Sequence, residues 1–109
     1  MHNKATFYSL QRQGFIRVAA CTPQMCVGDP QANTDETLLM MREGEARKAD
    51  LMLFPELGIS AYAIDDLLLQ DALLDGVEAG IDQLVKASKR QKPVVIVGAP
   101  VRRNGRLYN

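Results

Sequence analysis

The chain has 109 residues, with 13 basic and 13 acidic side chains and a formal net charge of zero at pH 7. This length allows one domain at most, or part of one, and the balanced charge argues against nucleic acid or a membrane surface as a partner. The sequence holds no apolar run of membrane-spanning length and no secretory signal. Its two cysteines make no disulfide framework, so the cytoplasm is the default compartment.

The chain opens on a polar arm, residues 1–14, that carries the aromatic side chains of Phe7 and Tyr8. Two interpretations are open for this arm: a flexible terminus, or a segment whose aromatics dock on another subunit or domain. Residues 15–21 (FIRVAAC) predict a first strand. Residues 22–30, with two prolines and a Gly-Asp pair, predict a loop.

A first helix is predicted to begin at Asn33, because an Asn cap followed three residues later by Glu36 is typical of a helix N-terminus. The helix is predicted to run to about Lys48. Residues 51–54 then predict a second strand, and their uninterrupted apolar character is expected of a strand covered on both faces.

A second helix is predicted from Asp65 or Asp66, where acidic side chains suit the positive end of the helix dipole. Its apolar side chains recur at helical spacing: Leu69, Leu73, Val77, Ile81 and Leu84. Gly76 and Gly80 share one face of this helix. That spacing leaves two interpretations open, close approach to a neighbouring element or simple tolerance of glycine.

The C-terminal part of the chain predicts a third strand and a hairpin. Residues 94–97 form a β-branched run, and Asn104-Gly105 is a signal for a tight turn between residues 101–103 and 106–108. The resulting order, β-α-β-α-β-hairpin, defines an α/β fold class.

An enclosed parallel sheet is not expected to stop beside an apolar residue such as Leu107. We therefore expect residues 15–109 to be the N-terminal portion of a domain that continues beyond the chain end, preceded by the arm over residues 1–14. The unpaired apolar edge predicts that the isolated chain self-associates or folds poorly.

The leading candidate for chemistry is Glu56, in the stretch Phe54-Pro55-Glu56-Leu57. Pro55 has no N–H to give to a sheet, so the strand is predicted to end there. Glu56 then follows the carboxyl end of a buried strand, where open α/β sheets bind their ligands. Desolvation at such a position suits a carboxylate to proton abstraction near neutral pH, whereas the alternative is a solvated loop acid.

The cysteines, Cys21 and Cys26, are predicted to be structural. Cys21 falls at the end of the first strand, where a small buried apolar role is common, and the single histidine, His2, lies in the arm. These counts argue against a Cys-His dyad and against a zinc site. No phosphate-binding loop is present, and a receiver-type domain would need acids where Cys21-Thr22-Pro23 stands.

Several stretches resemble the nitrilase, or carbon–nitrogen hydrolase, superfamily. FPEL at residues 54–57 followed by SAY at residues 60–62 is similar to its first motif. More closely, FYSLQRQGFIRVAACTPQMCVGDPQAN, SAYAIDDLLLQDALLD and VVIVGAPVRRNGRLYN resemble the glutaminase domain of glutamine-dependent NAD synthetases. The resemblance runs from about Phe7 to Asn109. One departure is Ala61, where the family usually has glycine, so a left-handed backbone at this position would be strained.

The resemblance implies an α-β-β-α sandwich and a Glu-Lys-Cys triad. Glu56 matches the general base, which takes the thiol proton so that the cysteine attacks the glutamine amide carbon and releases ammonia; the lysine stabilises the tetrahedral intermediate. Tyr62 matches a tyrosine beside the glutamine pocket and is a candidate substrate-binding residue. The lysine and cysteine motifs are expected beyond Asn109, so this chain lacks both, and no metal ligand is expected within it.

The resemblance also implies an enzyme of NAD biosynthesis. Ammonia passes to a C-terminal domain that uses ATP and Mg to amidate deamido-NAD, and the full-length protein is expected to be a homo-oligomer; no cofactor is expected in this chain. We expect these 109 residues alone to show no glutaminase activity, because the nucleophile is missing. Two alternatives stay open: a fragment of a stand-alone nitrilase-type amidase, and a non-catalytic truncated product.

Overall fold

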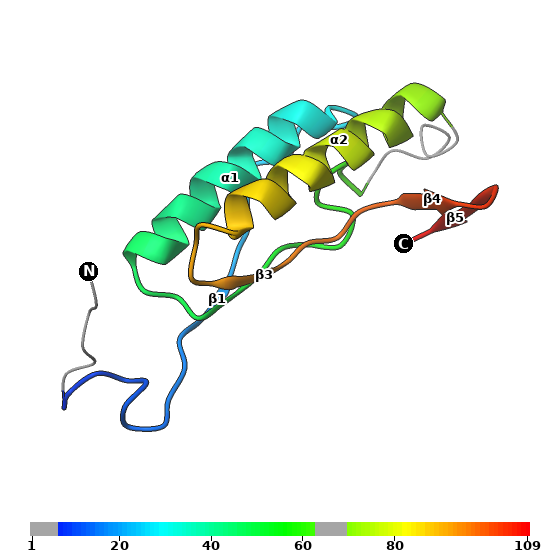
Figure 1. Cartoon of the computed structure of the whole chain (residues 1–109). Helices are drawn as coiled ribbons and strands as arrows, with labels where there is room; N and C mark the ends of the chain where they lie inside the picture. The colour runs from blue at the N-terminus through cyan, green and yellow to red at the C-terminus, as the bar shows by residue number, and fades with distance from the viewer. Residues whose placement is uncertain (1–6, 63–69) are drawn as a thin grey trace.

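The computed structural model of the chain describes residues 7–62 and 70–109. Two helices lie side by side over one face of a sheet, and a hairpin follows at the end of the chain (Figure 1). The elements in chain order are β1 (Val18–Ala20), α1 (Pro30–Ala46), β2 (Leu51–Leu53), α2 (Asp71–Ser88), β3 (Val94–Ile96), β4 (Val101–Arg103) and β5 (Arg106–Tyr108). The α/β order predicted from the sequence is therefore confirmed.

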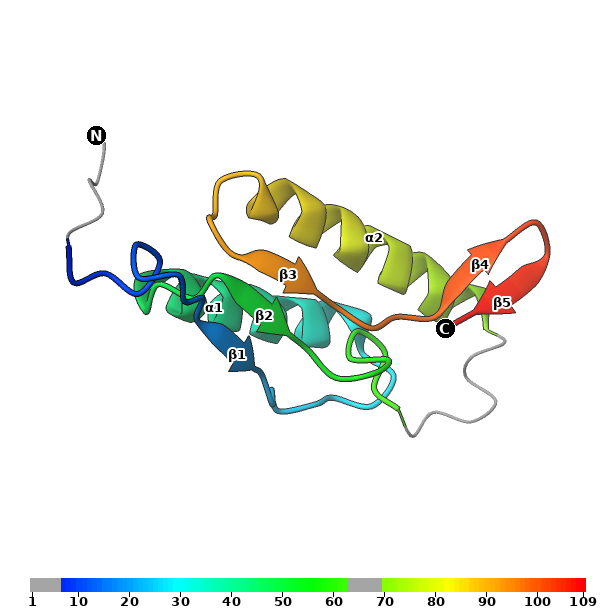
Figure 2. The ribbon, with the colours of Figure 1, turned by 90° about the horizontal axis from the view of Figure 1, so that it is seen from below.

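The sheet is parallel, with strand order β1-β2-β3. Leu51 of β2 stands between Val18 of β1 and Val94 of β3, and the register continues in step along all three strands. Because parallel neighbours need a crossover, α1 connects β1 to β2 and α2 connects β2 to β3, and both cover the same face (Figure 2). The carboxyl ends of the three strands consequently meet at one edge of the sheet.

Close contacts between the helices and with the sheet build the core. Met52 of β2 is only 2% exposed, and its thioether lies against Gly44 of α1 with no room for a Cβ there. A Cβ on Gly80 of α2 would collide with the hydroxyl of Thr34, and one on Gly76 would lie 3.2 Å from the ring of Pro30. Close approach is therefore confirmed at Gly80, whereas at Gly76 the proline ring would need to shift by only a few tenths of an ångström to admit a methyl group.

No described residue covers the opposite face of the sheet. Apolar side chains from all three strands point to that side and are exposed: Val18, Leu53, Val94 and Ile96. The expectation that the strand over residues 51–54 is covered on both faces is wrong for this structure, since Leu53 is 48% exposed while its neighbour Met52 is buried. The all-apolar strand therefore contributes to a second apolar surface, which the described residues leave exposed.

The start of α1 differs from the prediction. The N-cap is Asp29, whose carboxylate accepts a hydrogen bond from the Ala32 N–H at 3.0 Å, and Pro30 occupies the first turn, where its missing N–H costs nothing. Asn33 lies inside the helix and its side chain is used elsewhere. The helix ends at Ala46 rather than at Lys48, because Lys48 has a left-handed φ of 61°.

The other boundaries follow local signals closely. The predicted start of the second helix at Asp65 or Asp66 lies outside the described residues; α2 begins at Asp71, after Gln70 in an extended conformation. The hairpin strands match the prediction, and both Asn104 and Gly105 have positive φ, as its tight turn requires. Neither described helix combines the length and apolar character that a membrane span needs.

The described part of the arm is tied to the body through Asp50, at the start of β2. One carboxylate oxygen of Asp50 accepts hydrogen bonds from the Arg17 backbone N–H at 2.7 Å and from the Gln11 amide at 2.9 Å. The rings of Phe7 and Tyr8 pack edge to face with centroids 5.2 Å apart, and both are exposed. Whether these aromatics dock on another subunit or domain stays a prediction.

Candidate active site

The site begins where β2 ends. Phe54 is buried and its N–H donates to the Ile96 carbonyl of β3 at 2.9 Å, but Pro55 has no N–H to continue the ladder. The chain therefore leaves the sheet at Pro55, and Glu56 lies just past the carboxyl end of the central strand, as predicted. Its side chain is exposed, which in this structure matches the solvated one of the two environments considered for it.

A tight turn follows Glu56. The Gly58 N–H donates to the Pro55 carbonyl at 3.1 Å, and the Ser60 N–H donates to the Leu57 carbonyl at 3.2 Å. Leu57 is buried in a left-handed conformation with φ 52°, which is unfavourable for a residue with a Cβ. Backbone strain of this kind persists only where the surroundings over-determine the conformation, and it clusters at functional sites.

Gly98, just past β3, forms the support beneath Glu56. Its carbonyl accepts the Ile59 N–H at 3.2 Å. A Cβ at position 98 would lie 2.5 Å from the Leu57 nitrogen, 2.7 Å from the Pro55 carbonyl oxygen and 2.9 Å from the Glu56 Cα. Only glycine allows this approach of backbone to backbone. The signal that could have indicated this role is the place of Gly98 directly after a β-branched strand.

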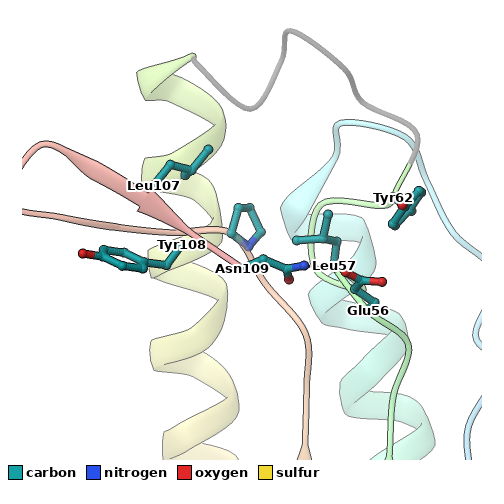
Figure 3. Close-up of a pocket in the computed structure, with 7 residues that line it drawn as sticks. Glu56, Leu57, Tyr62, Leu107, Tyr108 and Asn109 are labelled. Atoms are coloured by element: carbon teal, nitrogen blue, oxygen red, sulfur yellow. Dashed lines mark hydrogen bonds between the residues drawn. The ribbon is translucent and has the colours of Figure 1, made fainter.

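Glu56 and Tyr62 share a cavity of about 390 Å³. The C-terminal end of β5 and the residue after it form the other wall, so segments far apart in sequence meet there (Figure 3). The lining residues are Glu56, Leu57, Tyr62, Pro100, Leu107, Tyr108 and Asn109. The two site residues predicted from the sequence are thus brought together. Sequence reasoning missed the contribution of the hairpin residues, because no local pattern indicates which loop they face.

Asn33 braces the loops that frame this edge of the sheet. Its buried side chain accepts the Cys26 N–H at 2.7 Å and donates to the carbonyls of Cys26 at 2.7 Å and Ile59 at 3.1 Å. The loop after β1 and the turn after Glu56 are therefore held to one point on α1. The sequence flagged Asn33 as a helix cap, whereas its amide serves these tertiary contacts.

Both cysteines are free thiols away from the cavity lining. Cys21 is buried at the end of β1, its Sγ lies 3.8 Å from the Ala19 carbonyl, and burial raises the pKa of its thiol. Cys26 is exposed in the following loop. Across residues 7–62 and 70–109 no three His, Cys, Asp or Glu side chains come together to hold a metal ion.

The structure thus has a sheet with two helices on one face and an acid at its carboxyl edge. Residues 17–109 match the carbon-nitrogen hydrolase family, and the chain belongs to this family. It is similar to glutamine-dependent NAD(+) synthetases, with 50% identity over 103 residues to that of Mycobacterium tuberculosis and 44% over 103 residues to that of Mycobacterium leprae. Both alignments cover 94% of this chain. The chain spans about 15% of the length of these relatives.

Solved structures agree with the fold. The glutamine-dependent NAD+ synthetase of Acinetobacter baumannii, in complex with adenosine diphosphate, superimposes with a TM-score of 0.78 at 27% identity, covering 86% of this chain and 18% of that one. The enzyme of Cytophaga hutchinsonii gives a TM-score of 0.73 at 25% identity, covering 86% of this chain and 16% of that one. The predicted fold class and the resemblance to NAD synthetases are therefore confirmed.

Proposed function

We propose that this chain provides the general base of a glutaminase within a glutamine-dependent NAD synthetase. The ammonia released from glutamine serves the ATP-dependent amidation of deamido-NAD, a step for regions outside these 109 residues. The observation that carries the proposal is the position of Glu56, past the carboxyl end of the central strand and in a cavity that also holds Tyr62. Similarity to synthetases over 94% of the chain supports it.

In this mechanism Glu56 takes the proton from the nucleophilic thiol, and the sulfur forms a bond to the amide carbon of glutamine. The tetrahedral intermediate collapses as the C–N bond breaks, and Glu56 returns the proton to the leaving ammonia. Water then attacks the thioester, giving its proton to Glu56, and the thiol is regenerated with glutamate as product. Tyr62, which is 69% exposed on the cavity wall, contacts the substrate.

Neither cysteine of this chain is proposed as the nucleophile. Cys21 is buried, and burial raises the pKa of its thiol, which disfavours the reactive thiolate. Cys26 is not among the residues that line the Glu56 cavity. The nucleophile and the lysine of the triad are therefore proposed to come from sequence beyond Asn109, and the 109 residues by themselves are inactive.

A chimera tests the proposal. This chain replaces the aligned segment of the Mycobacterium tuberculosis synthetase, and ammonia release from glutamine is measured. Glu56→Gln should lower kcat by about 10²–10⁴-fold, because a positioned base contributes that much. Glu43→Gln serves as the matched control, since Glu43 is an exposed acid of α1 whose one ion pair among the described residues is with Arg47, one turn on.

Two outcomes would count against the proposal. One is a Glu56→Gln chimera that hydrolyses glutamine as fast as its parent. The other is ammonia release by the purified 109-residue chain that disappears on Glu56→Gln, because it would place the nucleophile inside this sequence.

A further inference from the structure

A charged contact fixes the hairpin to the N-terminal half of α2. The guanidinium of Arg102 in β4 reaches two carboxylates one turn apart, Asp71 at 2.6 Å from Nη1 and Asp75 at 2.7 Å from Nη2, and Glu78 lies 4.0 Å from Nη2. Arg102 keeps only 32% of its side chain exposed. A planar guanidinium that uses both terminal nitrogens holds a defined orientation, unlike a single flexible charge.

The hairpin transmits that anchor to the cavity. Arg102 stands directly opposite Leu107, and Val101 stands opposite Tyr108. A two-residue turn at Asn104-Gly105 joins the two strands, and all three residues of β4 pair in register with those of β5. Fixing β4 on α2 therefore fixes the end of β5 against the cavity.

At the end of β5, Asn109 reaches Glu56. Its amide nitrogen Nδ2 donates to Glu56 Oε1 at 2.5 Å across 53 positions of sequence, and Figure 3 shows its side chain directed toward Glu56. Within residues 7–62 and 70–109, this is the one hydrogen bond of the Glu56 side chain. The donor is neutral and an ionised carboxylate only accepts, so Oε1 is occupied while Oε2 stays free to take a proton.

We propose that Asn109 is a positioning residue for Glu56, held in place by the ion pairs of Arg102 through the hairpin. This inference rests on the proposed role of Glu56 as the glutaminase base. Without the amide, an exposed glutamate samples several rotamers, and only some of them direct an oxygen toward the thiol. Small errors in the position of a reacting group lower rates steeply.

The test uses the chimera described above, with kcat and KM for glutamine measured separately. Asn109→Ala and the isosteric Asn109→Asp should each lower kcat by about 10- to 100-fold and leave KM within about threefold. Arg102→Gln should lower kcat in the same way but less. Arg103→Gln is the matched control, because Arg103 has the same charge on the same strand and no ion pair with a described residue.

A double variant separates positioning from general damage to the fold. If Arg102 acts through Asn109, then Arg102→Gln in the Asn109→Ala background should change kcat by less than about twofold. Circular dichroism and the melting temperature of each variant accompany the kinetics. Asn109 is exposed, so both of its variants should fold like the parent.

Each result bears on one of the two claims. If Glu56→Gln abolishes activity but Asn109→Ala and Asn109→Asp keep the parent kcat, the positioning role of Asn109 is wrong. The proposed role of Glu56 as the general base then still stands. A raised KM with unchanged kcat also overturns it, because Asn109 would then be a substrate contact. Full activity of Glu56→Gln removes the proposed function itself, whatever the Asn109 variants do.

Discussion

The two faces of the three-stranded sheet differ in what covers them. Two consecutive residues of β2 show it best: Met52 is buried against α1, whereas Leu53 is exposed on the other side. The covered face is packed so tightly that Gly44 and Gly80 have no room for a methyl group. The open face carries apolar side chains too, and the described residues leave it exposed. In an α-β-β-α sandwich this is the side that meets the second sheet. Composition alone does not reveal which apolar face a given chain covers by itself.

The difference between the two faces is tested most strongly by placing a single charge on each face of β2 in turn. Met52→Lys should destabilise the chain by about 3–5 kcal/mol or prevent folding, because it buries an uncompensated charge. Leu53→Lys should cost less than about 1 kcal/mol, because Leu53 is exposed, and it should reduce self-association of the isolated chain. Urea unfolding and analytical ultracentrifugation measure the two effects. Equal losses of stability would mean that the faces do not differ.

The edge of the sheet offers a second contrast, between two glycines. Gly98→Ala should cost about 1–3 kcal/mol and lower glutaminase activity of the chimera by about 10²-fold, because backbone atoms of the Glu56 turn must move. Gly76→Ala should be close to neutral, since alanine gains about 1 kcal/mol in a helix and meets only the edge of a proline ring at 3.2 Å. Thermal melts and ammonia release report both. A neutral Gly98→Ala would show that the support beneath Glu56 is loose.

A smaller effect is expected at Ala61, which is buried with φ 68°. The sequence predicted strain at Ala61 if its backbone were left-handed, and its φ does lie in the left-handed region. Ala61→Gly should therefore stabilise the chain by up to about 1 kcal/mol, because the left-handed cost exceeds the extra flexibility of glycine in the unfolded state. Ala79→Gly, on the exposed side of α2, should instead destabilise it by about 1 kcal/mol. The two unfolding midpoints should move in opposite directions.

The smallest effect concerns pH and the arm. Hydrogen bonds from the Arg17 backbone N–H, and then from the Gln11 amide, hold the pKa of Asp50 below its ordinary value. The ionised Asp50 therefore stabilises the fold above its unfolded pKa of about 3.9, and this contribution is lost as pH falls through the lower folded pKa. Asp50→Asn should lower the melting temperature at pH 6 but not in strong acid. Asp82→Asn replaces an exposed acid on α2 and should leave the melting temperature unchanged at both pH values. An Asp50→Asn effect of the same size at all pH values would contradict the role given to the ionised carboxylate.

Local signals in the sequence predicted much of the fold. Pro55 set the end of β2 and thereby placed Glu56, and Asn104-Gly105 set the hairpin turn, because each constrains the backbone by itself. The cap of α1 was misplaced because Asn33 has a choice of partners, and the choice is made by Cys26 and Ile59. Such partners are known only once the chain has folded.

The candidate site divides in the same way. Glu56 and Tyr62 were found from a motif that is continuous in sequence, and both line the cavity. Asn109 and Gly98 were not found, because each acts on Glu56 or its backbone from a distant segment. Contacts across 53 positions leave no periodic or compositional trace in a single sequence.

The central claim is that Glu56 activates a thiol, and alkylation tests it most directly. In the chimera, the rate constant for modification of the nucleophilic cysteine by iodoacetamide is followed by mass spectrometry at pH 7. Glu56→Gln should lower this rate constant at least about tenfold relative to the parent and to Glu43→Gln, because the thiol loses the base that takes its proton. An unchanged rate constant would contradict a role for Glu56 as the general base.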